Sequence, residues 1–344
     1  MKPFPSFSPP SSWQVIHTVD MHTGGEPLRI FTDGLPEIKG ATILEKRRYF
    51  RDHYDALRTA TMWEPRGHAD MYGAVITPPA TPGADFGVFF MHNEGYSTMC
   101  GHAIIALTKF MLESGRIRKE GDTPQLVIDA PPGMIIATAY RQGQTVHRSS
   151  FLNVPSFVLL RDGSVKVSGL GEIRFDIAFG GAFYAIVDAG AVRTSLEVSN
   201  HDRLIDYGRK IKQAVMNTYT VKHPYEEDLD FLYGVIFTAP PHDPSHHSRN
   251  VCIFAGGELD RSATGSGVSA RAALLHDKHE LQPGEVITIE SILDTVMEVG
   301  IREVTTYGPY KAVIPEVSGT AYFTGQHTFY IDPDDPLRKG FIFR

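Results

Sequence analysis

Apolar residues along this chain occur mainly in short runs bounded by glycine, proline and small polar residues, a pattern typical of β-strands. The first half opens with two such runs, at residues 13–23 and 27–32, which Gly24 and Gly25 separate. One longer stretch, 41–62, has apolar residues spaced among basic ones and predicts a helix. Further strands are expected at 71–78, 86–92, 125–129, 134–140 and 151–160.

A loop that runs directly into an apolar helix occurs once in each half. In the first half the loop ends at Cys100, and the apolar residues of 104–111 predict a helix buried nearly all round. Aligning Cys100-Gly101-His102-Ala103 with Thr264-Gly265-Ser266-Gly267 places the two helix starts 164 residues apart, close to half the chain. This spacing predicts an internal duplication, with two similar lobes facing each other across a cleft. The strands expected before the second helix lie at 173–178, 182–188, 231–238 and 250–254.

The duplication also suggests how the chain divides. We expect a first lobe of residues 1–165, together with the C-terminal segment from about 320 to 344, and a second lobe of residues 166–319. The proline- and histidine-rich stretch 240–249 has no apolar periodicity and predicts a surface loop. The first fifteen residues carry four prolines and no continuous apolar core, so we expect a short disordered lead there rather than a signal peptide.

Composition narrows the classes of function. Of the 344 residues, 42% are hydrophobic and 21% are charged, as in ordinary globular proteins. The formal net charge of -7 argues against nucleic acid as a partner. No apolar run approaches the roughly 20 residues that cross a bilayer, so no membrane partner is expected. With only two cysteines, Cys100 and Cys252, a disulfide framework is excluded and a cytoplasmic location is expected.

Cys100 is the first candidate for chemistry, because it stands where the first apolar helix should begin. A thiol at a helix N-terminus feels the positive end of the helix dipole and nearby unpaired N–H groups, which lower its pKa. The alternative is a small buried apolar residue, the commoner role of a free cysteine. The matching segment Thr264-Gly265-Ser266 favours the functional interpretation, since two helix N-termini would surround a small anion such as a carboxylate with backbone donors.

Two further residues have both a functional and a structural interpretation. Asp260 lies four residues before Thr264 in the same loop and could bind a substrate ammonium, or it could be an ordinary capping carboxylate. Cys252 lies inside an apolar strand pattern, which favours a buried structural thiol. A strand could nevertheless deliver Cys252 near the cleft, because it is close in sequence to Thr264.

The loops around Cys100 and Thr264 resemble the two catalytic loops of the proline racemase family. HNEGYSTMCGHAIIAL (92–107) is similar to the first loop, which carries M-C-G-H, and DRSATGSGVSAR (260–271) to the second, which usually reads D-R-S-P-C-G-T-G. The resemblance implies two lobes of the diaminopimelate epimerase type (α+β), each a curved, mainly antiparallel sheet wrapped around a central helix. Other segments that resemble the family are DMHTGGEPLRI (20–30), EPRGHADMYGAV (64–75), GGAFYA (180–185), DLDFLYG (228–234) and DDPLRKGF (334–341).

The mechanism implied by the family uses two thiols on opposite faces of the substrate Cα, with no metal and no other cofactor. Here Thr264 stands in place of the second cysteine. A hydroxyl is a poor acid-base partner near neutral pH, so two-base racemisation should fail. The Cys/Thr pair resembles the branch of the family that dehydrates trans-3-hydroxy-L-proline. In that substrate the hydroxyl and the α-hydrogen share one ring face, so Cys100 alone could remove the proton and assist departure of hydroxide.

The resemblance also implies how the substrate is held. Backbone N–H groups of Gly101, His102, Gly265 and Ser266 would bind the carboxylate as charge moves onto it, at roughly 2.7–4 kcal/mol for each well-placed donor. Asp260, with the His102 side chain, would bind the ring nitrogen. Enzymes of this kind are commonly homodimers.

Several alternatives remain open from the sequence. Metal-dependent hydrolysis has candidate ligands in the first half, but the i, i+4 pair His242 and His246 is interrupted by Pro244, and solvated histidines are expected there. A cysteine hydrolase would need Cys100 and His102 to meet, and two residues apart at one helix start they should point different ways. A proline racemase or 4-hydroxyproline 2-epimerase and a non-catalytic binding protein are the remaining candidates. The metal candidates in the first half are His22, His68, Asp70, His92 and His102.

Overall fold

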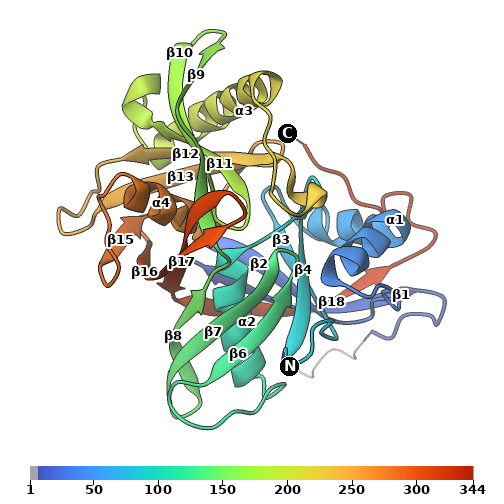
Figure 1. Ribbon diagram of the computed structural model, residues 1–344. Coiled ribbons are helices and arrows are strands. Elements are labelled where there is room, and N and C mark those ends of the chain that lie inside the picture. The colour runs from blue at the N-terminus through green and yellow to red at the C-terminus, as the bar shows by residue number, and fades with distance from the viewer. Residues whose placement is uncertain (1–6, 344) are drawn as a thin grey trace.

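The computed structural model describes residues 7–343, and in this part of the chain eighteen strands form one continuous hydrogen-bonded network with four α-helices (Figure 1). The strands are mainly antiparallel and curve around two of the helices, which confirms the α+β class and the two-lobed architecture. The first half contains β1 (Gln14–Thr23), β2 (Glu26–Asp33), α1 (Ile43–Met62), β3 (Tyr72–Thr77), β4 (Phe86–His92), β5 (Tyr96–Ser97), α2 (Gly101–Glu113), β6 (Gln125–Ala130), β7 (Gly133–Gln142) and β8 (Thr145–Leu152). The second half contains β9 (Ser156–Val167), β10 (Gly171–Phe179), β11 (Phe183–Asp188), α3 (His201–Thr218), β12 (Leu232–Ala239), β13 (Ser248–Phe254), β14 (Glu258–Leu259), α4 (Gly265–Asp277), β15 (Val286–Glu290), β16 (Val296–Tyr307), β17 (Tyr310–Gly319) and β18 (Ala321–Ile331).

The two halves repeat the same order of elements and the same pairings. Strands β2 and β3 are parallel with α1 between them in the chain, and β11 and β12 are parallel with α3 between them. In each half an antiparallel pair follows, then a two-residue strand, then the buried helix. The helices α2 and α4 both have 13 residues and begin 164 positions apart. The internal duplication expected from the two loop-helix segments is therefore present throughout both lobes.

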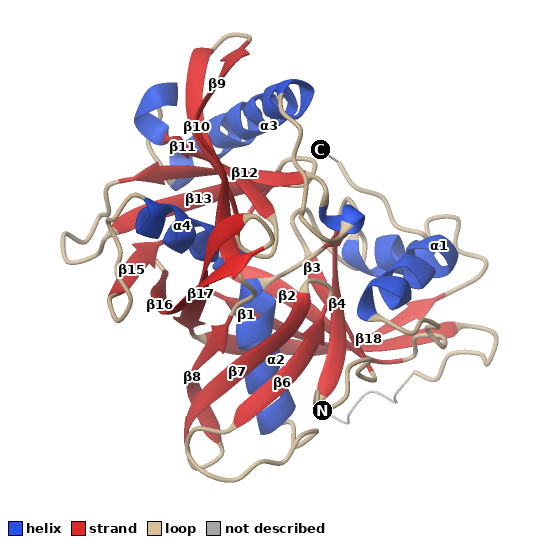
Figure 2. Cartoon of the chain, in the orientation of Figure 1, coloured by secondary structure: helices blue, strands red, loops and turns tan. Residues whose placement is uncertain are grey.

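The helices α2 and α4 form the centres of the two lobes. Strands β1, β2, β7, β8, β17 and β18 contact α2, and strands β9, β10, β11, β16 and β17 contact α4. Figure 2 shows both helices enclosed by strands, whereas α1 lies on the outside of the molecule. A separate apolar cluster, which includes Phe50 and Phe89, holds α1 against β4. Nearly every residue of α2 and α4 is buried, as the apolar sequence of the first helix predicts.

Two strands near the C-terminus connect the halves. Strand β17 pairs with β16 and also with β8 and β9, so it joins the sheets of both lobes. Strand β18 returns to the first half and pairs with β1 from Gln14↔Ile331 onward, where Figure 1 shows the red and blue strands side by side. These pairings support our proposal that the C-terminal segment belongs with the first lobe. Because β9 contacts α4, its residues 156–165 pack with the second lobe and not with the first, where we expected them.

Some local expectations were wrong. The strand expected at 151–160 is two strands, because the chain turns at 153–155, where Pro155 cannot donate a backbone hydrogen bond. Ordered structure also begins before residue 16: the Phe7 ring lies 5.4 Å from that of Tyr330, and β1 starts at Gln14. Residues 1–6 of the expected disordered lead lie outside the described residues. None of the helices within 7–343 is long and apolar enough to cross a membrane.

Candidate active site

A small cavity lies where α2 and α4 begin. Its volume is about 20 Å³, room for about one water molecule. A five-membered amino-acid ring is several times larger, so the lobes must separate for such a substrate to enter. The residues predicted from the sequence all line this one cavity: Cys100, Gly101, His102, Asp260, Thr264, Gly265 and Ser266. The remaining lining residues are Tyr72, Met99, Tyr184, Tyr233 and Phe254.

The two helix starts touch each other through glycine. A Cβ added to Gly101 would lie 2.5 Å from the Cα of Gly265, and one added to Gly265 would lie 2.6 Å from the Cα of Gly101. Any larger residue at either position would force the helices apart. The first intrahelical bonds are made by the N–H groups of Ile104 and Val268, so the N–H groups before them have no carbonyl partner in their own helix. Two sets of backbone donors therefore converge, an arrangement that favours an anion such as a carboxylate.

Burial dominates the electrostatics of Cys100. The residue is only 3% exposed, and this burial raises the pKa of its thiol well above the ordinary value, while contacts with the Ala103 N–H and the Tyr72 hydroxyl lower it. The carboxylates of Asp260 and Glu26 add to the increase in the pKa. From the helix dipole and the nearby unpaired N–H groups we expected a lowered pKa, and this expectation was wrong in direction. In this closed site the loss of hydration outweighs the stabilisation that the helix terminus gives to a thiolate.

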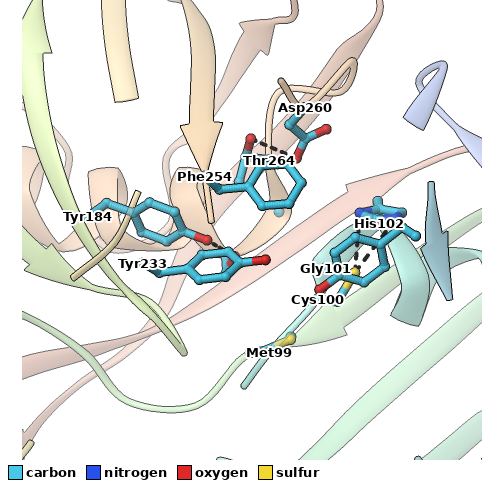
Figure 3. Close-up of a pocket in the computed structure, with 12 residues that line it drawn as sticks. Met99, Cys100, Gly101, His102, Tyr184, Tyr233, Phe254, Asp260 and Thr264 are labelled. Atoms are coloured by element: carbon cyan, nitrogen blue, oxygen red, sulfur yellow. Dashed lines mark hydrogen bonds between the residues drawn. The ribbon is translucent and has the colours of Figure 1, made fainter. Parts of the chain in front are cut away.

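Cys100 and His102 are in contact, contrary to the expectation from their spacing. The Cys100 Sγ lies 3.2 Å from Nδ1 of His102 and 3.6 Å from Nε2 (Figure 3). The reason is that Cys100 is the N-cap residue with extended backbone (φ -142°, ψ 99°), so helical periodicity does not govern its side-chain direction. Burial lowers the pKa of His102, and the ring donates a hydrogen bond to the Pro27 carbonyl. A neutral imidazole with its N–H so engaged has its other nitrogen available to accept the thiol proton of Cys100.

Thr264 is held in a different way at the start of α4. Its hydroxyl donates to Oδ2 of Asp260 at 2.8 Å, and its N–H donates to Oγ of Ser262 at 3.1 Å. The other carboxylate oxygen of Asp260 accepts bonds from the Ser262 N–H and hydroxyl, each at 2.8 Å. Figure 3 shows Thr264 and Asp260 on one side of the pocket and Cys100 with His102 on another. The Thr264 hydroxyl therefore uses its proton in a hydrogen bond to the Asp260 carboxylate.

Cys252 lies behind Thr264 and outside the cavity lining. It is fully buried on β13, and its thiol is hydrogen-bonded to Thr264. Burial raises the pKa of this thiol well above the ordinary value, and the charge of Asp260 raises it further. The strand does bring Cys252 close to the site, as its sequence position allowed. Its side chain nevertheless packs within the second lobe.

Glu26 is a buried carboxyl group near Asp260 that the sequence reasoning missed. It is fully buried on β2, and burial, followed by the charge of Asp260, raises its pKa well above the ordinary value. One carboxyl oxygen accepts the Arg261 N–H at 2.8 Å, and within residues 7–343 the other oxygen has no hydrogen-bond partner. A protonated, neutral Glu26 fits this environment. Its signal was available, because Glu26 lies in the DMHTGGEPLRI segment that resembles the family.

The three tyrosines of the cavity were missed as well. Tyr72 is on β3, Tyr184 on β11 and Tyr233 at the start of β12, and all three are buried. The Tyr184 hydroxyl lies 2.7 Å from Oγ of Ser266. Each tyrosine belongs to one of the segments quoted above for their family resemblance, 64–75, 180–185 and 228–234. Those segments therefore supply the cavity with phenol groups from three separate strands.

A possible metal-binding group lies elsewhere. Within the described residues, the side chains of His242, Glu290 and Asp294 come close enough to share an ion. Arg249 already binds both carboxylates, with Nη1 2.7 Å from Glu290 and Nη2 2.6 Å from Asp294. His246 is 2.9 Å from Glu290 and its side chain is only 24% exposed, so the expectation that it is simply solvated was wrong. The arginine supplies the positive charge that balances these carboxylates.

The comparisons with known proteins identify the family. A model of the proline racemase family matches residues 18–342. This chain belongs to the proline racemase family. It is 52% identical to a trans-3-hydroxy-L-proline dehydratase of Colwellia psychrerythraea, over 97% of this chain and 94% of that protein. A 3-hydroxyproline 2-epimerase of Burkholderia multivorans is 43% identical, over 96% of this chain and 98% of its own.

A solved structure of a hydroxyproline epimerase has the same fold. The hydroxyproline epimerase of Agrobacterium vitis, with bound trans-4-hydroxy-L-proline, matches with a TM-score of 0.90 and 29% identity. The alignment covers 96% of each chain, so both lobes are matched. The family resemblance carried by the two loops at Cys100 and Thr264 is thus confirmed over nearly the whole chain.

Proposed function

We propose that this protein is a hydro-lyase that dehydrates trans-3-hydroxy-L-proline to pyrroline-2-carboxylate and water. The observation that carries the proposal is the hydrogen bond from the Thr264 hydroxyl to Asp260, at 2.8 Å, in the position where racemases of the family have a second thiol. A hydroxyl so engaged cannot serve as the second acid-base group near neutral pH. The 52% identity to a protein named as this dehydratase supports the same conclusion.

In this proposal the substrate carboxylate binds between the two helix starts. The backbone N–H groups of Gly101, His102, Gly265 and Ser266 donate to it, and they stabilise the negative charge that moves onto the carboxylate when the α-proton leaves. Asp260 provides the negative charge opposite the ring nitrogen. It is 4% exposed and lines the cavity, so its interaction with an ammonium would be only weakly screened.

Cys100 is the base in this scheme. Its thiolate, which the Ala103 N–H stabilises, removes the α-proton of the substrate. The 3-hydroxyl of trans-3-hydroxy-L-proline lies on the same ring face as that proton, so both bonds that break face the Cys100 side. Loss of hydroxide leaves an enamine, which tautomerises to the cyclic imine. All the groups used belong to the protein, and the proposal includes no cofactor and no metal.

An epimerase or racemase is the second candidate, favoured by the 43% identical relative of that name. Such a reaction requires a proton donor on the face opposite Cys100. Cys252 is the thiol nearest to Thr264, but it is fully buried and does not line the cavity. This arrangement argues against epimerisation and favours dehydration.

We infer that the enzyme works in the cytoplasm, since both cysteines are free thiols and a reducing compartment maintains them. We also propose that it is a homodimer, and sedimentation of the pure protein tests that state. Its one expected partner besides itself is the small-molecule substrate.

The proposed activity is tested with pure protein and trans-3-hydroxy-L-proline, with the imine detected by o-aminobenzaldehyde. We expect imine formation that survives exhaustive treatment with EDTA. trans-4-Hydroxy-L-proline is the matched control, because it offers the same carboxylate and α-hydrogen but no 3-hydroxyl to eliminate. Epimerised product with no imine would favour the second candidate. A loss of activity on chelation that zinc restores would contradict the cofactor-free mechanism.

A further inference from the structure

Tyr72 occupies a position beside Cys100 that the mechanism above does not use. It lies on β3, is 3% exposed and lines the cavity. Its hydroxyl is hydrogen-bonded to the Cys100 thiol and to the Ser97 hydroxyl. Its ring also packs edge-on against His102, with ring centres 4.8 Å apart. A phenol is thus held on the side of the cavity from which Cys100 acts.

Dehydration of a 3-hydroxyproline requires an acid on that same side. Hydroxide is a poor leaving group, and a proton delivered to the oxygen as the C–O bond breaks turns it into water. The departing oxygen is on the ring face of the α-hydrogen, which faces Cys100. The acid must therefore be close to Cys100 and must still carry its proton when the thiolate forms.

Three other polar groups around the cavity do not meet this requirement. His102 is neutral and donates its N–H to the Pro27 carbonyl. Thr264 donates to Asp260 on the other side of the cavity, and Tyr184 pairs with Ser266 at the start of α4. Tyr72 contacts the thiol directly, and burial raises the pKa of its phenol well above the ordinary value, so it keeps its proton at neutral pH.

We propose that Tyr72 is the catalytic acid that protonates the departing 3-hydroxyl group, an inference that rests on the proposed dehydratase function. The Cα–H bond breaks and its proton goes to the Cys100 thiolate. The C3–O bond breaks, and the Tyr72 O–H proton goes to the leaving oxygen and forms water. The new Cys100 thiol then passes its proton to the Tyr72 phenolate through their hydrogen bond. The α-proton is thus the proton that restores the acid, and the enzyme ends in its starting state.

Tyr72→Phe tests this assignment, because it removes the hydroxyl and keeps the ring. We expect dehydration of trans-3-hydroxy-L-proline to fall by at least about 100-fold, the lower end of what a general acid contributes. Exchange of the α-hydrogen of L-proline in deuterium oxide should stay within a few fold of the wild type, since it needs Cys100 and no leaving group. Release of fluoride from trans-3-fluoro-L-proline should also be nearly unchanged, because fluoride departs with far less help from an acid.

The matched control is Tyr96→Phe. Tyr96 is a partly buried tyrosine on β5 whose hydroxyl donates to Asp55 at 2.8 Å, outside the cavity lining. This variant should dehydrate at the wild-type rate. If Tyr72→Phe does not fold, a fluorinated tyrosine placed at position 72 keeps the shape and makes the phenol more acidic. The alkaline limb of kcat for the hydroxylated substrate should then move to lower pH.

Three results would overturn the assignment of Tyr72. The first is wild-type dehydration by Tyr72→Phe, and the second is an alkaline limb that the fluorinated residue leaves in place. The third is a folded Tyr72→Phe protein that loses exchange and fluoride release as severely as dehydration, because Tyr72 would then be needed by the thiol and not by the leaving group. A wild-type protein that forms no imine at all would instead contradict the proposed function, so the two failures are distinguishable.

Discussion

The starts of α2 and α4 occupy equivalent positions in a duplicated fold, yet their N-cap residues are built differently. Cys100 has extended backbone (φ -142°), whereas Thr264 has a positive φ of 68°. The Cys100 thiol contacts groups that can exchange a proton with it, namely His102 and Tyr72. The Thr264 hydroxyl donates to Asp260. Both lobes thus present backbone donors to one cavity, but of the two N-cap side chains only the Cys100 thiol is suited to proton transfer.

The backbone of Thr264 is held in an unfavourable conformation by the loop that precedes α4. A positive φ is unfavourable for a β-branched residue, and such strain persists only where surrounding bonds hold the backbone. Here those bonds come from the side chains of Asp260 and Ser262, to the hydroxyl and the N–H of Thr264. The duplication therefore conserves the anion-binding geometry of the helix starts, while the N-cap residue decides which face of a substrate can exchange a proton.

The largest effect expected from this comparison is the loss of activity in Cys100→Ser. A serine hydroxyl is a far weaker acid than a thiol, so dehydration should fall by roughly 10²–10⁴-fold or more. The o-aminobenzaldehyde assay measures it. Cys252→Ala is the matched control in the second lobe, expected to keep its turnover and lose about 1 kcal/mol of stability. A well-folded Cys252→Ala protein without activity would contradict this division between the two thiols.

A gain of function is expected from Thr264→Cys. The wild type should exchange the α-hydrogen of L-proline for deuterium but form no appreciable D-proline, because it has no proton donor on the Thr264 face. The variant has a thiol on both faces and should racemise proline measurably, at a modest rate, since the added thiol lies beside the carboxylate of Asp260. Chiral chromatography in deuterium oxide tests both statements. Substantial D-proline from the wild type would remove the main physical support for the dehydratase assignment.

The pH dependence of Cys100 alkylation tests how burial changes the pKa of this thiol at the start of α2. Burial raises the pKa of the Cys100 thiol, so its iodoacetamide reaction in the free enzyme should rise with pH and reach its midpoint above about 8.5, the ordinary cysteine value. Bound substrate or pyrrole-2-carboxylate should protect the Cys100 thiol from alkylation. A midpoint well below that value would show that the helix terminus and His102 outweigh burial.

The smallest expected effect is a change in thermal stability on substitution of Glu26, which lies near Asp260 in the loop before α4. Its folded pKa is raised, so the stability that it contributes is present below its unfolded pKa of about 4.3 and is lost as pH rises through the folded pKa. Glu26→Gln should therefore raise Tm at neutral pH, by about 1–2 °C in a chain of 344 residues if the free energy of unfolding changes by about 1 kcal/mol. The gain should shrink toward pH 4. The exposed substitution Glu303→Gln, with the same change of charge, should leave Tm unchanged.

Much of the architecture could be predicted from local sequence pattern. The apolar helix after Cys100, its counterpart after Thr264 and their separation of 164 residues led to the two-lobed fold, because a buried helix has a recognisable composition. α3 was missed although its signal was present: Leu204, Ile211 and Val215 are buried along one face of an otherwise polar helix. The duplication itself points to α3, since α1 occupies the same place between two parallel strands.

The chemistry of the site was determined only in part by the sequence. The residue types at positions 100, 260 and 264 already indicated one thiol, one carboxylate and one hydroxyl at two helix starts. Tertiary structure decided the rest: that Tyr72 from β3 reaches Cys100, that Glu26 from β2 lies beside Asp260, and that burial raises the pKa of the thiol. These properties depend on which distant strands pack around the helix starts and on how much water they exclude. Neither is encoded in the spacing of residues along one loop, because desolvation and long-range contacts arise only when both lobes have folded together.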